Sequence, residues 1–368
     1  MSLAAARELV MAYGWNATAY QILNPGIEHW FSPEAPGVVG YTRRAKVMLV
    51  AGEPACAHEV LAEVARAFED FARSNGCRVC YVCAAERMRE LLAGSPRHAA
   101  VTIGAQPVWD PRRWSDAVKS HPSLRAQLNR SRNKGVVIEP LDPEQARDNA
   151  ELQSVLREWL DGRTLPPLHF LTEPVTLAGE VRDRILLVAR REGRMAAFLV
   201  ASPIGARRGY LIEQVARARS APNGTAELLI DNAMRRFADG GGSYVSLGLV
   251  ALATRADVEL AKNPAWLRAM MRLARAHANR FYNFRGLEQF RAKMLPERWE
   301  PVYAISNERR FSMRTLYAIG EAFAGMPPWM AIGIGAAKAA RDELRGFARK
   351  VSFAMRKGMA RAQTASTR

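Results

Sequence analysis

Glu213 is a carboxylate that lies inside an apolar run, Tyr210–Val215, where burial is expected. The turn cluster Ser220–Thr225 follows this run and carries the signals of a helix start. Free backbone amides and the helix dipole favour negative charge at such a start. We therefore expect a strand that leads through a tight loop into an anion-binding helix N-terminus. An ordinary strand, Pro-Asn-Gly turn and helix would have the same spacing, and that interpretation is equally well supported.

Aromatic and cationic residues alternate in a second stretch, residues 281–303. Its cations include Arg285, Arg291 and Lys293, as a pocket for a bulky anionic substrate would require. A core helix edged with solvated charges would show much of the same pattern.

The elements around the first stretch predict a fold type. Apolar residues at three- and four-residue spacing indicate a helix that ends at Gly240–Gly242, followed by a buried strand, Tyr244–Leu249. Strand, Gly-containing turn, helix and strand form the core of acyltransferases of the GNAT type. The loop RARSAPNGTAELL lacks the paired glycines (R/Q-x-x-G-x-G/A) that are usual for acetyl-coenzyme A. We therefore expect a GNAT-like fold with a different donor.

The first half of the chain loosely repeats this plan. In the first half, strands are predicted at 38–41, 46–50, 78–83 and 101–103, with one helix that starts at 52–54 and a short helix over 86–92. In the second half, strands are predicted at 184–190, 195–201 and 210–215. The predicted fold class is α/β (α+β): two GNAT-like units in tandem, with two mixed sheets flanked by helices. The boundaries that we expect are 1–140 for the N-terminal unit, 141–310 for the catalytic unit, and 311–368 for a basic amphipathic helical tail.

A basic helix is predicted between the halves, over Pro122–Gly135. Its cations, which include Arg125 and Arg130, could contact phosphates at the junction or form a solvated face, and the two interpretations are equally supported. The 368-residue chain carries a formal net charge of +17. This charge implies a polyanionic partner, either nucleic acid or an anionic membrane surface.

Cysteine usage indicates a reducing compartment. Cys77, Cys80 and Cys83 form C-x-x-C-x-x-C, but the residues between them favour a strand, so buried structural thiols are expected rather than a metal cluster. No charged-then-apolar signal segment opens the chain, and we expect no export.

The C-terminal tail is expected to lie on a membrane rather than to span it. Residues 311–340 contain no uninterrupted apolar run of the required length, about 20 residues. From Leu344 onward, Phe347, Val351 and Met355 form an apolar stripe among basic residues, as an in-plane helix on an anionic bilayer needs. A helix on the protein's own core, or a flexible basic end, is the alternative. On the membrane interpretation, a chain cut before Arg341 stays folded but no longer sediments with anionic vesicles.

Several separate motifs, in this order, carry a family resemblance. VMLVAGEPA, LRAQLNRSRNKG, APNGTAELL, YVSLGLVAL and FYNFRGLEQFRAKMLPERWEPVYA resemble the C-terminal catalytic domain of the aminoacyl-phosphatidylglycerol synthases, over roughly residues 41–305. The resemblance implies a tandem GNAT fold that moves an amino acid from aminoacyl-tRNA, as co-substrate, to a lipid headgroup such as phosphatidylglycerol. It implies a stand-alone form at the inner face of the cell membrane, with no other cofactor, no metal and no DNA partner. The oligomeric state is left open.

The resemblance also suggests roles for particular residues. Glu213 would be the base, or the carboxylate that holds the amino acid's ammonium group, although it could instead pair with Arg217 or another arginine. The catalytic candidates are Glu213, Arg217 and Lys293. The substrate-binding candidates are Asn223, Gly224, Thr225, Glu227, Asn283, Arg285, Arg291, Tyr303, Arg125 and Arg130. Two alternatives remain open: an N-acyltransferase with an acyl-coenzyme A or acyl-carrier donor, and a non-catalytic module that binds tRNA or anionic lipid.

Overall fold

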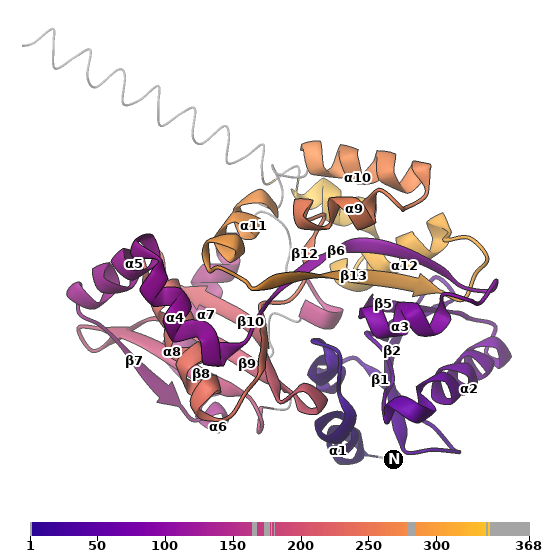
Figure 1. Ribbon diagram of the computed structural model, residues 1–368, viewed down its shortest axis with the longest axis horizontal. Helices are drawn as coiled ribbons and strands as arrows, with labels where there is room; N and C mark the ends of the chain where they lie inside the picture. Colours follow the sequence, from indigo (N-terminus) through magenta and orange to yellow (C-terminus); the bar gives the residue numbers. More distant parts are fainter. Residues whose placement is uncertain are drawn as a thin grey trace, which may run out of the picture.

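A single continuous sheet organises the molecule (Figure 1). The computed structural model describes residues 2–163, 168–172, 177, 179, 181–277, 284–335 and 338. Its 13-stranded sheet has the order β1-β2-β3-β5-β13-β6-β11-β10-β9-β8-β7, with β4 on β2 and β12 on β6. The prediction of two separate sheets is therefore wrong. Local sequence patterns indicate strands but not which strands join them at long range.

The first half contains an antiparallel set of strands followed by a parallel crossover. Its strands are β1 (Glu28–Phe31), β2 (Gly37–Arg44), β3 (Val47–Ala51), β4 (Ala55–Cys56) and β5 (Arg78–Ala84). The crossover helix α2 (Leu61–Ser74) joins β3 to β5, which pair in parallel. Alternate residues of β3 enter different cores, Leu49 on one face and Val50 on the other, so the apolar run is buried on both sides.

The helix expected at 52–54 begins later, at Leu61. Gly52 has a φ of +79°, and β4 then pairs with β2, so the backbone here is extended rather than helical. The hairpin of β2 and β3, the strand β5 and the helix α3 (Glu86–Leu92) confirm their predictions.

The second half repeats the arrangement. Its strands are β7 (Val136–Leu141), β8 (Ile185–Arg191), β9 (Arg194–Ile204), β10 (Gly209–Arg217) and β11 (Tyr244–Ser246). Helix α8 (Thr225–Asp239) joins β10 to β11, which pair in parallel, and it ends at Gly240 as expected. Leu228, Met234 and Phe237 are buried on its inner face. The two strand-helix-strand crossovers confirm two GNAT-like units in tandem.

Two long strands are exchanged between these units. β6 (Ala99–Trp109) follows the first unit in the sequence, yet it pairs with β11 of the second unit and with β12 (Val250–Ala251). β13 (Arg298–Ser306) comes from the end of the second unit, and it pairs with β5 of the first. β6 and β13 also pair with each other along their length. The strand predicted over Tyr244–Leu249 is shorter than expected, because β11 ends at Ser246 and pairing with β6 resumes only at Val250, in β12.

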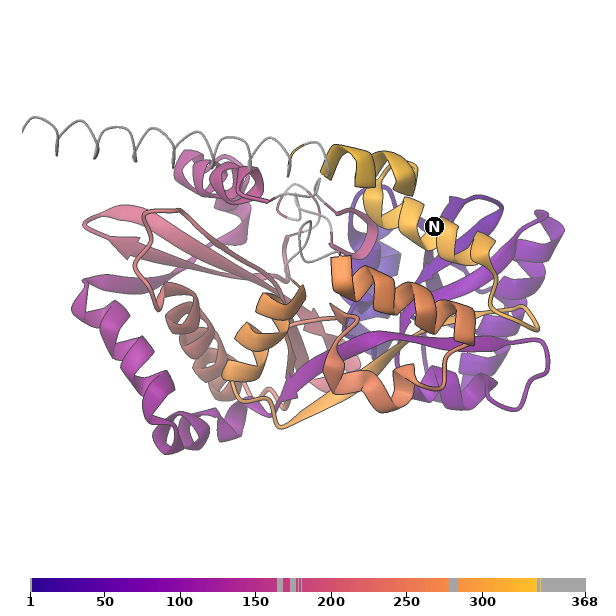
Figure 2. The same ribbon diagram turned by 90° about the horizontal axis from the view of Figure 1, so that it is seen from above.

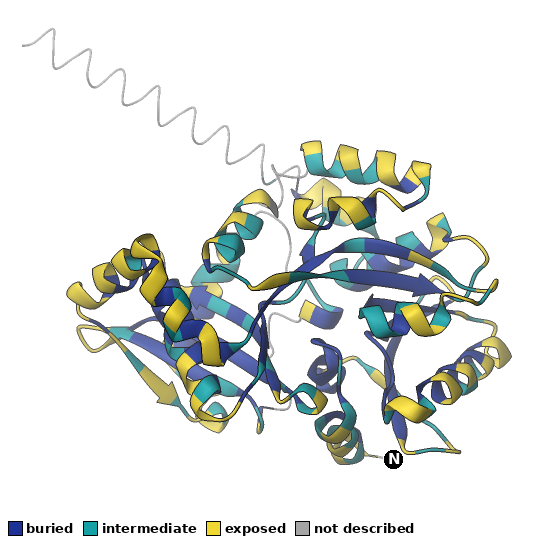
Figure 3. Cartoon of the chain, viewed as in Figure 1, coloured by how far each residue is buried: buried dark blue, intermediate teal, exposed yellow. Residues whose placement is uncertain are grey.

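Helices cover both faces of the sheet (Figures 2 and 3). The remaining helices are α1 (Leu3–Tyr13), α4 (Trp114–Ser120), α5 (Pro122–Asn133), α6 (Pro143–Ala146), α7 (Ala150–Asp161), α9 (Asp257–Leu260), α10 (Ala265–His277), α11 (Phe284–Lys293) and α12 (Met313–Ala324). In the second half α8 packs on one face and α7 on the other. α12, in the stretch assigned to the tail, packs against β2 and β3.

The predicted domain boundaries stay a prediction, and the amphipathic stripe of the tail from Leu344 onward lies outside the described residues. Across the part of the chain that the structure describes, no helix is both long and apolar enough to cross a bilayer.

Candidate functional site

The two parallel strands of the second unit pair over three residues only, which are the beginning of β10 and the whole of β11. β10 and β11 pair over Gly209–Leu211 and Tyr244–Ser246. β10 then continues to Arg217 beside β9, while β12, the strand that follows β11, continues along β6. The strands therefore diverge after Leu211 and Ser246, and the N-terminus of α8 follows the end of β10. We call this place the β10–β11 divergence.

The N-terminus of α8 holds a carboxylate and an ammonium group. Gly224 is the cap residue, with a φ of +96°, and no side chain caps the helix. Glu227, in the first turn, is buried, and its Oε1 accepts a hydrogen bond of 2.9 Å from Lys293 Nζ. The Lys293 side chain is 38% exposed, so this ion pair lies at the protein surface. The charges of Lys293 and Glu227 offset each other, so the positive end of the helix dipole and the backbone amides make this end of α8 electropositive.

Helix α11 fixes the cations at this place. Arg291 Nη1 donates to the Gly248 carbonyl at 2.7 Å, directly after β11. Met294, the residue after α11, is fully buried in the core of the second unit. Its carbonyl accepts a hydrogen bond of 2.8 Å from Trp109 Nε1, which anchors the end of α11. The structure thus joins α11 to two distant parts of the chain: Lys293 pairs with Glu227 of α8, and Arg291 bonds to Gly248 after β11.

Glu213 lies at a β-bulge in β10 and is paired with an arginine that the sequence analysis did not identify. The register of β10 against β9 shifts between Ile212 and Gln214, which leaves Glu213 outside the ladder. Arg184 Nε donates to Glu213 Oε1 at 2.9 Å, and Arg184 Nη2 donates to Asn24 Oδ1 at 2.8 Å. The side chains of Arg184 and Glu213 are 0% and 6% exposed. Glu213 is therefore held by Arg184 and not by Arg217.

Arg184 gave no signal of its own, because a single arginine before an apolar strand is common. The available signal was Glu213 itself, since a carboxylate in a buried strand requires a cationic partner.

Helix α5 covers the loop before α8. A Cβ atom on Gly224 would lie 2.4 Å from the Gln127 carbonyl oxygen of α5, so only glycine fits there. The Thr225 hydroxyl donates to the Pro222 carbonyl at 2.7 Å and lies 3.4 Å from Ser131 Oγ of α5. Thr225 is fully buried, so its hydroxyl stabilises the loop rather than facing a substrate.

The other candidates are dispersed. Asn223, Arg217, Arg285, Arg125 and Arg130 are exposed on the loop, the end of β10, α11 and α5.

Asn283 lies outside the described residues. Tyr303 is buried in β13 of the first unit, where its hydroxyl donates to Glu86 Oε2 at 2.5 Å. Burial and the Glu86 carboxylate raise the pKa of Tyr303. Strand exchange thus places Tyr303 in the first unit, away from Lys293 and Glu227, and its role in substrate binding stays a prediction.

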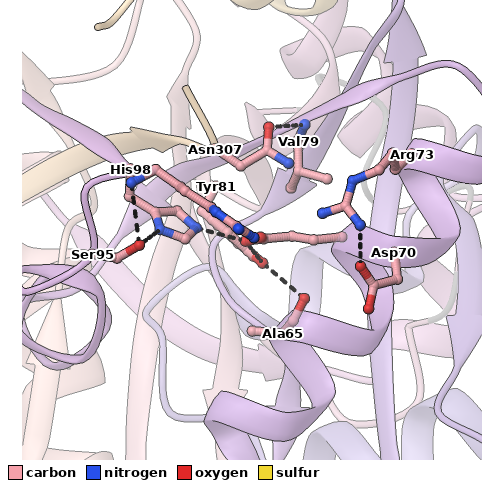
Figure 4. A network of polar contacts seen from close by, with 10 residues as sticks. Ala65, Asp70, Arg73, Val79, Tyr81, Ser95, His98 and Asn307 are labelled. Carbon is pink, nitrogen blue, oxygen red and sulfur yellow. Dashed lines mark hydrogen bonds and ion pairs between the residues drawn. The ribbon is translucent and has the colours of Figure 1, made fainter. Parts of the chain in front are cut away.

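A second polar cluster lies in the first unit (Figure 4). Glu69 Oε1 of α2 accepts from the Tyr81 hydroxyl at 3.0 Å and lies 2.9 Å from His98 Nε2, while His98 Nδ1 lies 2.8 Å from Ser95 Oγ. The cluster borders a cleft of about 910 Å³. Ser95 Oγ also accepts a hydrogen bond from the Arg97 amide at 3.3 Å, and such a bond stabilises a turn. The cluster therefore connects α2, β5 and the turn before β6.

The cysteines are free thiols. Burial raises the pKa of Cys56 and of Cys83 to about 12, and it raises that of Cys80 as well. Within the described ranges, no group of three or more His, Cys, Asp or Glu side chains is placed to hold a metal ion.

Comparison with known proteins places this geometry in context. A family model described as phosphatidylglycerol lysyltransferase, C-terminal, matches residues 7–306. A phosphatidylglycerol lysyltransferase of Staphylococcus haemolyticus is 19% identical over 82% of this chain and 35% of its own length. An MprF-like domain protein of Mycobacterium tuberculosis is 25% identical over 64% of this chain and 51% of its own length. The chain thus spans between about a third and a half of these curated relatives.

Solved structures share the fold. A C-terminal domain from Agrobacterium fabrum, named as that of a lysylphosphatidylglycerol synthetase, superposes with a TM-score of 0.72 at 21% identity, covering 88% of this chain and 96% of that one. L-PGS from Bacillus licheniformis superposes with a TM-score of 0.67 at 19% identity, covering 92% and 96%.

Proposed function

This chain belongs to the phosphatidylglycerol lysyltransferase C-terminal family, and from that membership we propose that it is an aminoacyltransferase. Its donor is aminoacyl-tRNA, and its acceptor is the headgroup of an anionic phospholipid such as phosphatidylglycerol. It works at the cytoplasmic surface of the membrane. The observation that carries the proposal is the pairing of Lys293 with Glu227 at the uncapped N-terminus of α8, beside the β10–β11 divergence.

The reaction is an ester exchange. A hydroxyl of the lipid headgroup attacks the carbonyl carbon of the aminoacyl ester, and a tetrahedral oxyanion forms. The bond between that carbon and the ribose oxygen of tRNA then breaks. The proton of the attacking hydroxyl passes to the departing ribose oxygen, so the reaction neither consumes nor releases a proton overall. The enzyme must therefore orient two substrates and stabilise the oxyanion.

The electropositive end of α8 supports that chemistry. The amides of its first turn and the Lys293 ammonium group can stabilise an oxyanion or hold a lipid phosphate. Glu227 fixes Lys293 in place through the 2.9 Å contact. Arg291 is occupied by the Gly248 carbonyl, and its role is to keep α11 over the divergence.

Glu213 is assigned to the substrate's ammonium group rather than to proton transfer. Arg184 donates to both carboxylate oxygens, at 2.9 Å and 3.4 Å, so removing a proton from the acceptor would compete with these bonds. A carboxylate has further lone pairs and can accept an additional N–H donor. The exposed Arg125 and Arg130 of α5 are assigned to the phosphates of tRNA.

The proposal is tested with purified protein, labelled aminoacyl-tRNAs and vesicles that contain phosphatidylglycerol, followed by chromatography of the lipids. Labelled lipid is expected from the wild type. We expect Lys293→Ala to reduce turnover about 10²-fold or more, as for the loss of an oxyanion donor. Lys119→Ala is the matched control, because Lys119 is 77% exposed on α4 and should leave turnover unchanged. Transfer from acyl-coenzyme A but not from aminoacyl-tRNA would refute the proposal.

A further inference from the structure

Exposed large hydrophobic side chains are concentrated in one part of the molecule. Among the described residues, those before residue 258 are Leu3, Leu91 and Val137. The others are Val258, Trp266, Leu273, Met313, Tyr317, Trp329, Met330, Ile332 and Ile334. Soluble proteins rarely gather exposed apolar side chains in this way without a binding function.

These residues come from elements that lie together. α9, α10, α12 and residues 328–335 lie on the same side of the molecule in both ribbon views (Figures 1 and 2). α10 and α12 share one core, through Leu267 of α10 and Ile319 of α12. The chain then folds back on α12, because a Cβ atom on Gly320 would lie 3.0 Å from the Pro328 ring. We define the apolar face as the exposed side chains Trp266, Leu273, Trp329, Met330, Ile332 and Ile334.

Positive charges outnumber negative charges around this face, and the acidic residues of α9 are both paired: Asp257 with Arg275, and Glu259 with Lys262. α10 contains Arg268, Arg272 and Arg275 and no acidic residue. Residues 309–338 contain Arg309, Arg310, Arg314 and Lys338 against the single acidic residue Glu321. Apolar and aromatic side chains edged with arginines match the interface of an anionic bilayer, where the rings enter the headgroup region and the guanidinium groups meet lipid phosphates.

We propose that the apolar face docks this protein on an anionic lipid bilayer. The inference rests on the proposed function, because it supplies the route by which a lipid headgroup reaches the site. α11, which carries Lys293, lies next to α10 in both ribbon views, so docking through α10 brings the β10–β11 divergence close to the membrane surface (Figures 1 and 2).

The test is sedimentation of the full chain with vesicles of phosphatidylcholine and phosphatidylglycerol, without tRNA. Trp329→Ser and Ile332→Ser should each weaken binding about tenfold or more, because each removes an apolar side chain from the interface. Val137→Ser on β7 is the matched control, since Val137 is 57% exposed and Ile332 is 60% exposed. We expect the control to bind as the wild type does. Arg272→Gln should weaken binding at low salt and have little effect at high salt.

Activity separates this inference from the proposed function. The docking variants should lose transfer to vesicle lipid but retain transfer to detergent-dispersed lipid, whereas failure of the proposed function would abolish both and leave vesicle binding intact. Wild-type sedimentation by Trp329→Ser and Ile332→Ser would overturn the inference. So would a wild-type dimer that these variants convert to a monomer, because the face would then be a subunit interface. Loss of vesicle binding after removal of residues 341–368 would also overturn it, because the tail, and not the apolar face, would then hold the protein on the bilayer.

Discussion

Replacing Arg184 with methionine is expected to destabilise the protein severely. The methionine keeps much of the apolar volume but removes the guanidinium that donates to Glu213 at 2.9 Å and 3.4 Å and to Asn24 at 2.8 Å. The Glu213 carboxylate, 6% exposed, then loses the cation that holds it. Breaking a buried ion pair from one side typically costs about 3–5 kcal/mol. That is a large share of the roughly 5–15 kcal/mol by which a folded protein is stable.

Glu213→Gln should lower the free energy of unfolding by less, about 1–3 kcal/mol. The amide oxygen can still accept a hydrogen bond from Arg184, and the Arg184 guanidinium keeps its hydrogen bond to Asn24. The double variant should be more stable than the sum of the single losses predicts, with a coupling of about 0.5–3 kcal/mol, because neither charge remains buried without its partner.

Urea unfolding followed by tryptophan fluorescence measures these differences. Arg217→Met is the control, since Arg217 is exposed and should change stability by no more than about 0.5 kcal/mol. An Arg184→Met protein as stable as the wild type would show that the pair contributes nothing to the fold. In the transfer assay, Glu213→Gln should raise KM for aminoacyl-tRNA, because the ammonium group loses its charged acceptor.

Three further outcomes are expected. Gly224→Ala should cost more than about 1 kcal/mol in urea unfolding, because φ is +96° and a Cβ atom would lie 2.4 Å from a carbonyl of α5, whereas Gly240→Ala, with a φ of −79°, should be close to neutral. Burial tends to raise the pKa of Asp183, but the hydrogen bonds from the Arg7 guanidinium and a tyrosine hydroxyl outweigh it, so the pKa is lowered. In urea unfolding, the wild type should therefore be more stable than Asp183→Asn at pH 6, and this difference should decline as the pH falls below about 4. A thiol reagent should label Cys77, which is half-buried, well before the three buried cysteines, and equal labelling of all four in the native state would contradict the structure.

The site was predictable where a short stretch of chain determines it. The strand Tyr210–Val215, the turn at Pro222 and the helix that follows depend on local periodicity and turn chemistry, and β10, Gly224 and α8 confirm them. The electropositive helix start follows from the same local features.

What was missed depends on contacts between distant parts of the chain. The position of Tyr303 is decided by which strands β13 pairs with, and its own sequence says only that it is a strand. The partner of Glu213 is Arg184, and neither periodicity nor spacing connects the two. The helix expected to start at Gly52 begins later because residues 55–56 pair with β2 as strand β4. Pairing between strands overrides local helix propensity there.

The exchanged strands also determine when the protein can fold during synthesis. β5 needs β13 along its second edge, and residues 298–306 are translated long after Ala84 has left the ribosome. At about 5–20 residues per second, the first unit would wait roughly 10–40 s with that edge uncovered. Uncovered strand edges recruit other chains. We therefore expect the nascent chain to rely on chaperones or on rapid completion of translation, and the N-terminal unit expressed alone to aggregate.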